Sequence, residues 1–176
     1  MYLYINGEKS IKKFLILTLL APFTAFAAIG GGVSFHNLTD VDSGYGDLDF
    51  SLNSINGVWE SSRNENLAFQ IKVGLGMGED SDKDEDGDRY DLEVNHLVQL
   101  KGMYFLNENV YAAATYTNYD IDTYIEYNDE TDGGTENDLG FMLGWRKDNL
   151  DLYFGPTYDE GSEGKIMEFG FTYFFD

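Results

Sequence analysis

Apolar and polar residues alternate with a period of two over most of the chain beyond residue 28. In the segment 167–175 the odd positions hold Met, Phe, Phe, Tyr and Phe, whereas the even positions include Glu168, Gly170 and Thr172. Because successive residues of a strand point to opposite faces, this alternation predicts a strand with one apolar and one polar face. The same pattern marks four other segments: 66–78, 90–101, 139–146 and 150–157.

Three weaker patterns, over 29–37, 47–59 and 109–127, bring the predicted strands to eight. The apolar positions change face near Ser54–Ile55 and near Thr117–Tyr119. At the second change we expect a β-bulge or a strand that runs well past a membrane. Short connections alternate with long acidic ones, which lie at 38–46, 79–89, 128–136 and 159–163. This organisation predicts an all-β fold, an eight-stranded antiparallel up-and-down barrel.

The first 27 residues have the organisation of a secretory signal peptide. Lys9, Lys12 and Lys13 precede a short apolar run over 14–23, and an Ala-x-Ala exit ends at Ala27. We therefore expect a signal-peptide helix over 1–27 and a barrel domain over 28–176. A retained anchor helix is the alternative, but the apolar run is too short to stop transfer across a membrane.

Alternation alone does not tell which face of the barrel is outside. In a transmembrane barrel the apolar face meets lipid, whereas in a soluble periplasmic barrel it lines a cavity for an apolar ligand. Glycine is frequent on the polar face, for example at positions 74, 140, 144 and 170. Glycine weakens a solvated strand but suits the interior of an eight-stranded barrel, which is only just wide enough for side chains. We therefore expect a transmembrane barrel with its polar face inward.

This orientation turns the charged residues of the clear strands toward the barrel interior, where they avoid lipid. The predicted interior residues are Lys72, Glu93, Lys101, Arg146, Asp151 and Glu168. His96 is the exception, because the alternation turns it outward. Aromatic residues gather near both ends of the predicted strands, which is typical of the two membrane interfaces.

Composition narrows the function. The 176 residues carry a formal net charge of −21, and cysteine is absent. So acidic a chain would repel a nucleic-acid backbone, so no nucleic-acid partner is expected. Without cysteine there are no disulfides, zinc–thiolate sites or thiol catalysis. We expect no cofactor.

The C-terminal residues carry a resemblance to a known family. The ending 168–175 is similar to the assembly signal of small bacterial outer-membrane β-barrels, with Gly170, Tyr173 and Phe175 at the matching positions; Asp176 follows the final aromatic residue. Together with the signal peptide and the eight strands, the chain resembles the OmpX/Ail-type barrels and the transmembrane domain of OmpA. The resemblance implies a Gram-negative outer-membrane location, recognition by the barrel-assembly machinery, and contact with outer-membrane lipid and lipopolysaccharide.

One acidic segment has the spacing of a calcium-binding loop. Asp82, Asp84, Asp86 and Glu93 fit the pattern D-x-D-x-D-G-x5-E, in which carboxylates surround the ion. No helical pattern flanks the segment, so we favour a solvated acidic loop. Loose attraction of divalent cations by the whole acidic rim is the expected behaviour.

Catalysis is not expected. Ser34 and His36 share a strand face, but no carboxylate partner is evident for a Ser–His arrangement. We expect an outer-membrane barrel with a plugged polar interior and acidic extracellular loops, in a structural or surface-interaction role. Two alternatives stay open: a small channel for ions or solutes, and the soluble periplasmic barrel that binds an apolar ligand.

Overall fold

The computed structural model describes residues 28–42, 46–61, 63–126, 130–159 and 165–175. The predicted signal peptide, residues 1–27, and Asp176 lie outside the described residues. Within these ranges no helix is long and apolar enough to cross a membrane.

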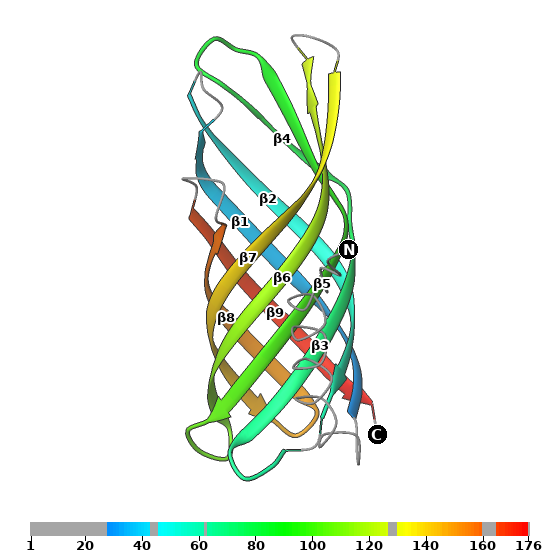
Figure 1. Ribbon diagram of the computed structural model, residues 1–176, viewed down its shortest axis with the longest axis vertical. Helices are drawn as coiled ribbons and strands as arrows, with labels where there is room; N and C mark the ends of the chain where they lie inside the picture. The colour runs from blue at the N-terminus through cyan, green and yellow to red at the C-terminus, as the bar shows by residue number, and fades with distance from the viewer. Residues whose placement is uncertain (1–27, 43–45, 62, 127–129, 160–164, 176) are drawn as a thin grey trace, which may run out of the picture.

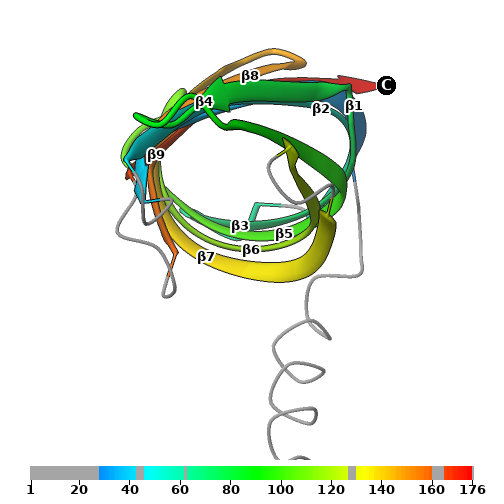
Figure 2. The same cartoon turned by 90° about the horizontal axis from the view of Figure 1, so that it is seen from above.

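The described residues form one antiparallel sheet that closes on itself (Figure 1). Its strands are β1 (Ala28–Asp42), β2 (Asp47–Glu60), β3 (Leu67–Gly76), β4 (Glu79–Lys83), β5 (Arg89–Phe105), β6 (Val110–Ile125), β7 (Glu130–Lys147), β8 (Leu150–Asp159) and β9 (Lys165–Phe175). The strand order is β3-β2-β1-β9-β8-β7-β6-β5-β4, and β3 also pairs with β5 to complete the ring (Figure 2). Because β3 and β4 both pair with β5, they share one position in the wall. The predicted eight-stranded up-and-down barrel is confirmed.

The strands extend further at the loop end than predicted. Strands β6 and β7 stay paired as far as Ile125 and Glu130, and β4 pairs with the start of β5. The predicted loop 79–89 and the described part of the predicted loop 128–136 are therefore partly strand, and β4 and the start of β7 lie at the top of Figure 1. Antiparallel pairing satisfies the backbone hydrogen bonds whatever the side chains are, so polar composition alone does not end a strand.

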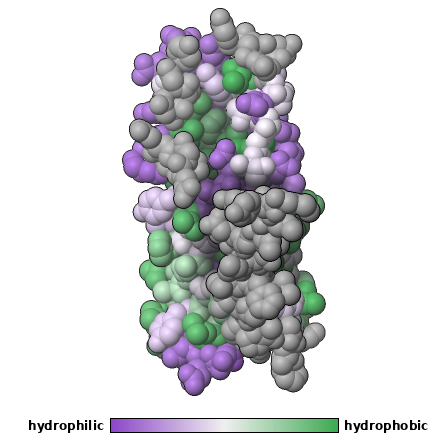
Figure 3. Space-filling view, viewed as in Figure 1, coloured by the Kyte–Doolittle hydropathy of each residue, from purple (hydrophilic) through white to green (hydrophobic). Residues whose placement is uncertain are grey.

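The apolar faces of the clear strands point outward, as predicted, except in the part of 90–101 that precedes Asn95. Phe169, Phe171 and Tyr173 on β9 are 49%, 36% and 48% exposed, whereas their neighbours Glu168 and Thr172 are buried. In Figure 3 the hydrophobic side chains of the described surface gather mainly in the lower half of the molecule. An exterior of this kind excludes the soluble-barrel alternative, because exposed apolar residues on neighbouring strands need lipid around them.

The apolar residues of β2 and β6 change face where predicted, but no bulge causes the change; for β6 the alternative of a strand that runs past the membrane is the one the structure supports. Alternation continues without a break along β2 and β6, so Leu52 and Ser54 both point inward, as do Thr117 and Tyr119. What changes is the chemistry of each face, not the direction of the side chains. Toward the loop end the inward residues become apolar, and outward residues such as Asp49 become polar.

Two strands do contain β-bulges. The register of β1 shifts between Leu38 and Val41, where Asp40 has a φ of 59°, and that of β5 shifts between Val94 and His96. The shift in β5 turns Val94 into the interior and leaves Glu93 exposed on the outside. The prediction that Glu93 lies inside the barrel is therefore wrong, because a bulge inverts the alternation above it. His96 points outward, as expected, and its Nδ1 lies 3.1 Å from Asp120 Oδ2.

The barrel wall thus has two parts of opposite polarity. In the lower wall, which includes the turn-side halves of the strands, apolar residues point out and polar residues point in. In the upper wall, formed by the loop-side ends of β1, β2, β5 and β6, apolar residues point in. Outward carboxylates such as those of Asp49 and Glu93 are costly in lipid. The lower wall is therefore the membrane-spanning part.

We expect Phe171→Arg to destabilise the inserted barrel by about 2–4 kcal/mol, because it places a charge on the lipid-facing surface. Asp132→Arg, on an exposed residue of the β7 extension, should be tolerated. Urea unfolding of the barrel in lipid vesicles measures both changes. Equal losses from the two variants would contradict the assignment of the outer face.

Candidate functional site

The interior of the lower wall holds a buried ion pair near its centre. Lys72 on β3 donates to Glu168 Oε1 on β9 over 2.5 Å, and the two side chains are almost fully buried. Lys72 Nζ also donates to Ser34 Oγ and to the Tyr153 hydroxyl, at 3.0 and 3.1 Å. Gln99 donates to the second oxygen, Glu168 Oε2, over 2.8 Å. The ammonium and the carboxylate are therefore each held by several hydrogen bonds, as a buried charge requires.

A second ionic cluster lies nearer the short turns. Arg146 on β7 forms a hydrogen-bonded ion pair with Glu60 on β2 and a 3.1 Å ion pair with Asp151 on β8. Gln70 donates to Glu60 Oε2 over 2.7 Å, and the Tyr111 hydroxyl donates to Asp151 Oδ1 over 2.8 Å. The two carboxylates thus share one guanidinium and take further hydrogen bonds from neutral side chains.

Lys101 lies between the two clusters, with its ammonium against aromatic rings. Its ammonium lies 3.3 Å from the centroid of the Tyr153 ring and 6.0 Å from that of Tyr111. The face of a tyrosine ring attracts a cation, most strongly where water is excluded. Lys101 is 2% exposed, so this attraction compensates part of its lost hydration.

Two glycines make room for the interior tyrosines. A Cβ atom at Gly144 would lie 2.0 Å from the Tyr111 ring, and one at Gly170 would lie 2.0 Å from the Tyr153 ring. Each glycine pairs with its tyrosine on the neighbouring strand. Glycine is needed at these positions because the tyrosine ring of the neighbouring strand lies over the backbone of the glycine and leaves no space for a side chain.

The structure places five of the predicted interior residues together inside the lower wall: Lys72, Lys101, Arg146, Asp151 and Glu168. Glu93, the sixth, lies outside the barrel. Sequence reasoning missed Glu60, because the predicted strand ended at Trp59. An unbroken alternation from Ser54 through Asn56 and Val58 would have placed Glu60 inward.

The proposed calcium ligands do not come together. No group of three or more His, Cys, Asp or Glu side chains in the described part of the chain is arranged to hold a metal ion. Asp84 Oδ1 instead accepts hydrogen bonds from the backbone N–H groups of Asp86 and Asp88, each over 3.0 Å, and so shapes the turn between β4 and β5. Asp82 Oδ2 accepts from the Asp49 N–H, and Glu93 lies further along β5.

The β4–β5 hairpin also carries a surface ion pair. Arg89 Nε lies 2.7 Å from Asp91 Oδ1 and reaches Ser81 Oγ through Nη2. A hydrogen bond from Ser81 lowers the pKa of Asp91, and Arg89 lowers it further. The pair lies at the surface and is only half-buried, so it orders the hairpin without adding much stability.

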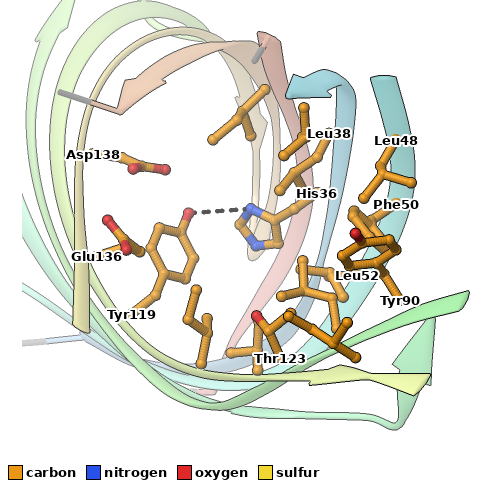
Figure 4. A pocket seen from close by; sticks show the side chains of 16 residues that line it. His36, Leu38, Leu48, Phe50, Leu52, Tyr90, Tyr119, Thr123, Glu136 and Asp138 are labelled. Carbon is orange, nitrogen blue, oxygen red and sulfur yellow. Dashed lines mark hydrogen bonds between the residues drawn. The ribbon is translucent and has the colours of Figure 1, made fainter. Parts of the chain in front are cut away.

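Inside the upper wall lies a cavity of about 300 Å³, which we call the upper cavity (Figure 4). Leu48, Phe50, Leu52 and Leu92 are buried around it. Lining residues nearer the loops, such as Ile125, are only half-buried, so the cavity opens toward the loop end. At its base His36 Nδ1 and the Tyr119 hydroxyl share a 3.3 Å hydrogen bond. Sequence reasoning missed this cavity.

Comparisons with known proteins identify the fold. No protein-family model matches the chain, and no curated protein matches it. Among solved structures, Ail, the attachment invasion locus protein of Yersinia pestis, matches with a TM-score of 0.57 and 14% identity, over 85% of this chain and 97% of that one. Ail in complex with the heparin analogue sucrose octasulfate matches with a TM-score of 0.53 and 13% identity, over the same shares. Neisserial surface protein A matches with a TM-score of 0.50 and 13% identity, again over 85% and 97%.

These matches and the geometry define the class of the protein. The chain has the fold of a transmembrane β-barrel of the bacterial outer membrane. More narrowly, it is similar to the small eight-stranded barrels represented by Ail and Neisserial surface protein A.

We expect Lys72→Met to lower the free energy of unfolding by about 3–5 kcal/mol, because Glu168 is left as an uncompensated buried charge. The double variant Lys72→Met/Glu168→Gln should recover part of this loss. Lys83→Met, on an exposed β4 residue, is the control and should change stability by less than about 0.5 kcal/mol. Urea titration monitored by tryptophan fluorescence measures the series. An equal loss in the Lys83 variant would contradict a special role for the buried pair.

We expect Gly170→Ala to destabilise the barrel by about 1–3 kcal/mol, since the added methyl group overlaps the Tyr153 ring. Gly57→Ala is the control, because its nearest atom outside the neighbouring residues, Val73 O, would lie 4.0 Å away. In a Tyr153→Leu background Gly170→Ala should cost little. If Gly170 matters only as part of an assembly signal, the loss of insertion will be the same in both backgrounds.

Proposed function

We propose that the chain is an outer-membrane barrel with a closed polar bore and an acidic extracellular surface, in a structural or surface-interaction role. The observation that supports a closed bore is a set of side-chain contacts between strands on opposite sides of the barrel. Gln99 on β5 reaches Glu168 on β9, and Lys72 on β3 reaches Tyr153 on β8. In each pair the two strands lie four positions apart in a ring of eight.

Side chains also meet across the bore nearer the short turns. Arg146 on β7 meets Glu60 on β2, and Gln70 on β3 reaches Asp151 on β8 over 3.3 Å. Cations and anions that pair across a narrow bore leave little free charge to attract a passing ion. These pairs favour a plug over a channel.

The acidic extracellular surface supports an interaction role. The chain carries a formal net charge of −21, and the upper wall turns carboxylates such as Asp49 and Glu93 outward. A negative surface attracts cations and basic partners and repels polyanions. The partner we infer is therefore basic, unlike the polysulfated ligand present in one Ail structure. Divalent cations are expected as loosely held partners of the same surface.

Other partners follow from the location. The apolar exterior of the lower wall would contact outer-membrane lipid and lipopolysaccharide, and Gly170, Tyr173 and Phe175 would present the assembly signal to the barrel-assembly machinery. We propose no catalytic activity. Ser34 Oγ bonds to the hydroxyl of Tyr153, whereas His36 bonds to that of Tyr119, so serine and histidine do not form a nucleophile–base pair.

We expect the purified barrel to show no steady conductance in planar lipid bilayers. Arg146→Ala should produce measurable ion flux, because Glu60 and Asp151 lose their common partner and water enters around them. Lys147→Ala removes the same charge from the adjacent, exposed residue and should stay silent. A steady wild-type conductance that Lys101→Ala or Arg146→Ala alters would instead establish the small-channel alternative.

A further inference from the structure

The upper cavity has the dimensions and lining of a small-molecule site. Its volume of about 300 Å³ lies at the lower end of the range of ligand pockets, roughly 300–1,000 Å³. One side is formed by apolar side chains of β1 and β2, among them Leu38, Leu48 and Phe50 (Figure 4). The ionic clusters of the lower wall do not reach the upper cavity, since Lys72, Lys101 and Arg146 are not among the residues that line the cavity.

A buried polar atom at the cavity points to a ligand. His36 is 3% exposed, and its Nδ1 is occupied by the Tyr119 hydroxyl. Its other ring nitrogen, Nε2, is buried without a hydrogen-bond partner among the described residues. In Figure 4 this nitrogen lies at the lower end of the His36 ring, within the circle of lining side chains. When Nδ1–H donates to the Tyr119 oxygen, Nε2 is an acceptor that a ligand N–H satisfies.

The charge of the cavity favours a cationic ligand. Glu136 and Asp138 on β7 line the side near Tyr119, opposite the apolar side chains of β2 (Figure 4). No lysine or arginine lines the cavity in the described part of the chain. The aromatic rings of Phe50, Tyr90 and Tyr119 also line it and add to the attraction for a cation.

We propose that the upper cavity binds a small amphiphilic primary amine from the extracellular side. The alkyl or aryl-alkyl body fills the space between Leu48, Phe50 and Leu92. The ammonium group, which has three N–H donors and no acceptor, donates to His36 Nε2 and to the carboxylates of Glu136 and Asp138. A carboxylate ligand of the same length is repelled by those two side chains. A neutral alcohol keeps the apolar contacts but lacks the ionic attraction.

Isothermal titration tests this on the full barrel in lipid nanodiscs, with empty nanodiscs as the blank for partition into lipid. The probes are hexylamine, hexanol and hexanoate, which share one apolar body. We expect saturable binding of about one hexylamine per barrel, at least tenfold tighter than hexanol, and no binding of hexanoate. The absence of saturable binding, or equal affinity for the three probes, would overturn the proposal.

Charge-matched variants locate the ammonium group. Glu136→Gln and Asp138→Asn should each weaken hexylamine binding by about tenfold or more, and hexanol binding should change much less. Asp132→Asn removes the same charge from an exposed residue of the same strand, and should change affinity less than twofold. An equal effect of Asp132→Asn would show that the whole acidic rim, not the cavity, attracts the amine, and would overturn the site.

A space-filling variant locates the apolar body. Leu52→Trp should abolish the binding of hexylamine and hexanol together, because the larger side chain occupies the cavity. The difference in electrophoretic mobility between heated and unheated samples shows whether each variant remains a folded barrel. If folded Leu52→Trp binds hexylamine as the wild type does, the cavity is not the site. The result is independent of the closed bore, since conductance is not part of this measurement.

Discussion

The narrow bore of an eight-stranded barrel is the constraint on which the rest of this structure depends. In the lower wall long side chains that point inward reach those of the far wall, so a buried charge has little room for water and binds a protein group instead. Glu168 satisfies both of its oxygens in this way, with Lys72 and Gln99. The same shortage of space explains why Gly144 and Gly170 lie next to interior tyrosine rings.

The second constraint is that the wall passes from lipid into water. In the lower wall the exterior must be apolar, which leaves the interior to polar residues. In the upper wall water surrounds the barrel, so the ordinary arrangement of a soluble protein returns and apolar residues gather inside. The apolar residues pass from the outer to the inner face of the wall in two ways. Strands β2 and β6 change their residue pattern without changing direction, whereas β1 and β5 each use a bulge.

Much of the fold follows from the sequence because the alternation in strands such as 167–175 is nearly complete. The lipid-facing side of Phe169, Phe171 and Tyr173 could be predicted, since glycines and charges share the opposite face. The upper wall could not be predicted in the same way. When the apolar residues of a strand change face, a bulge and a change of solvent produce the same pattern, and the sequence of one strand does not distinguish them. In β5 the bulge and the change of solvent coincide, so apolar residues such as Val94 and Val98 keep one phase in the sequence although they lie on opposite faces of the wall. Glu93 was misplaced because this pattern looks like an unbroken strand.

The contacts of the site were predictable only in part. That cations and anions would share the interior follows from the strand faces, but which of them meet depends on the stagger of strands around the ring. Lys72 and Glu168 are 96 residues apart and face each other because of that stagger. The upper cavity needed the same information, since its walls come from several strands and the sequence of one strand does not show which residues of the others face it.

The bulges at Asp40 and Asn95 have a consequence for how such a barrel can diversify. Each bulge shifts the alternation of its strand by one residue near the boundary between the membrane-spanning lower wall and the water-exposed upper wall. If the upper walls of two barrels were exchanged above these bulges, β1 and β5 would turn their inward apolar residues, such as Leu92, outward unless the recipient carried the same bulges. An exchange below the bulges would transfer the upper wall, both bulges and the upper cavity together. This is therefore the position at which a new extracellular part could be joined to an existing membrane-spanning wall.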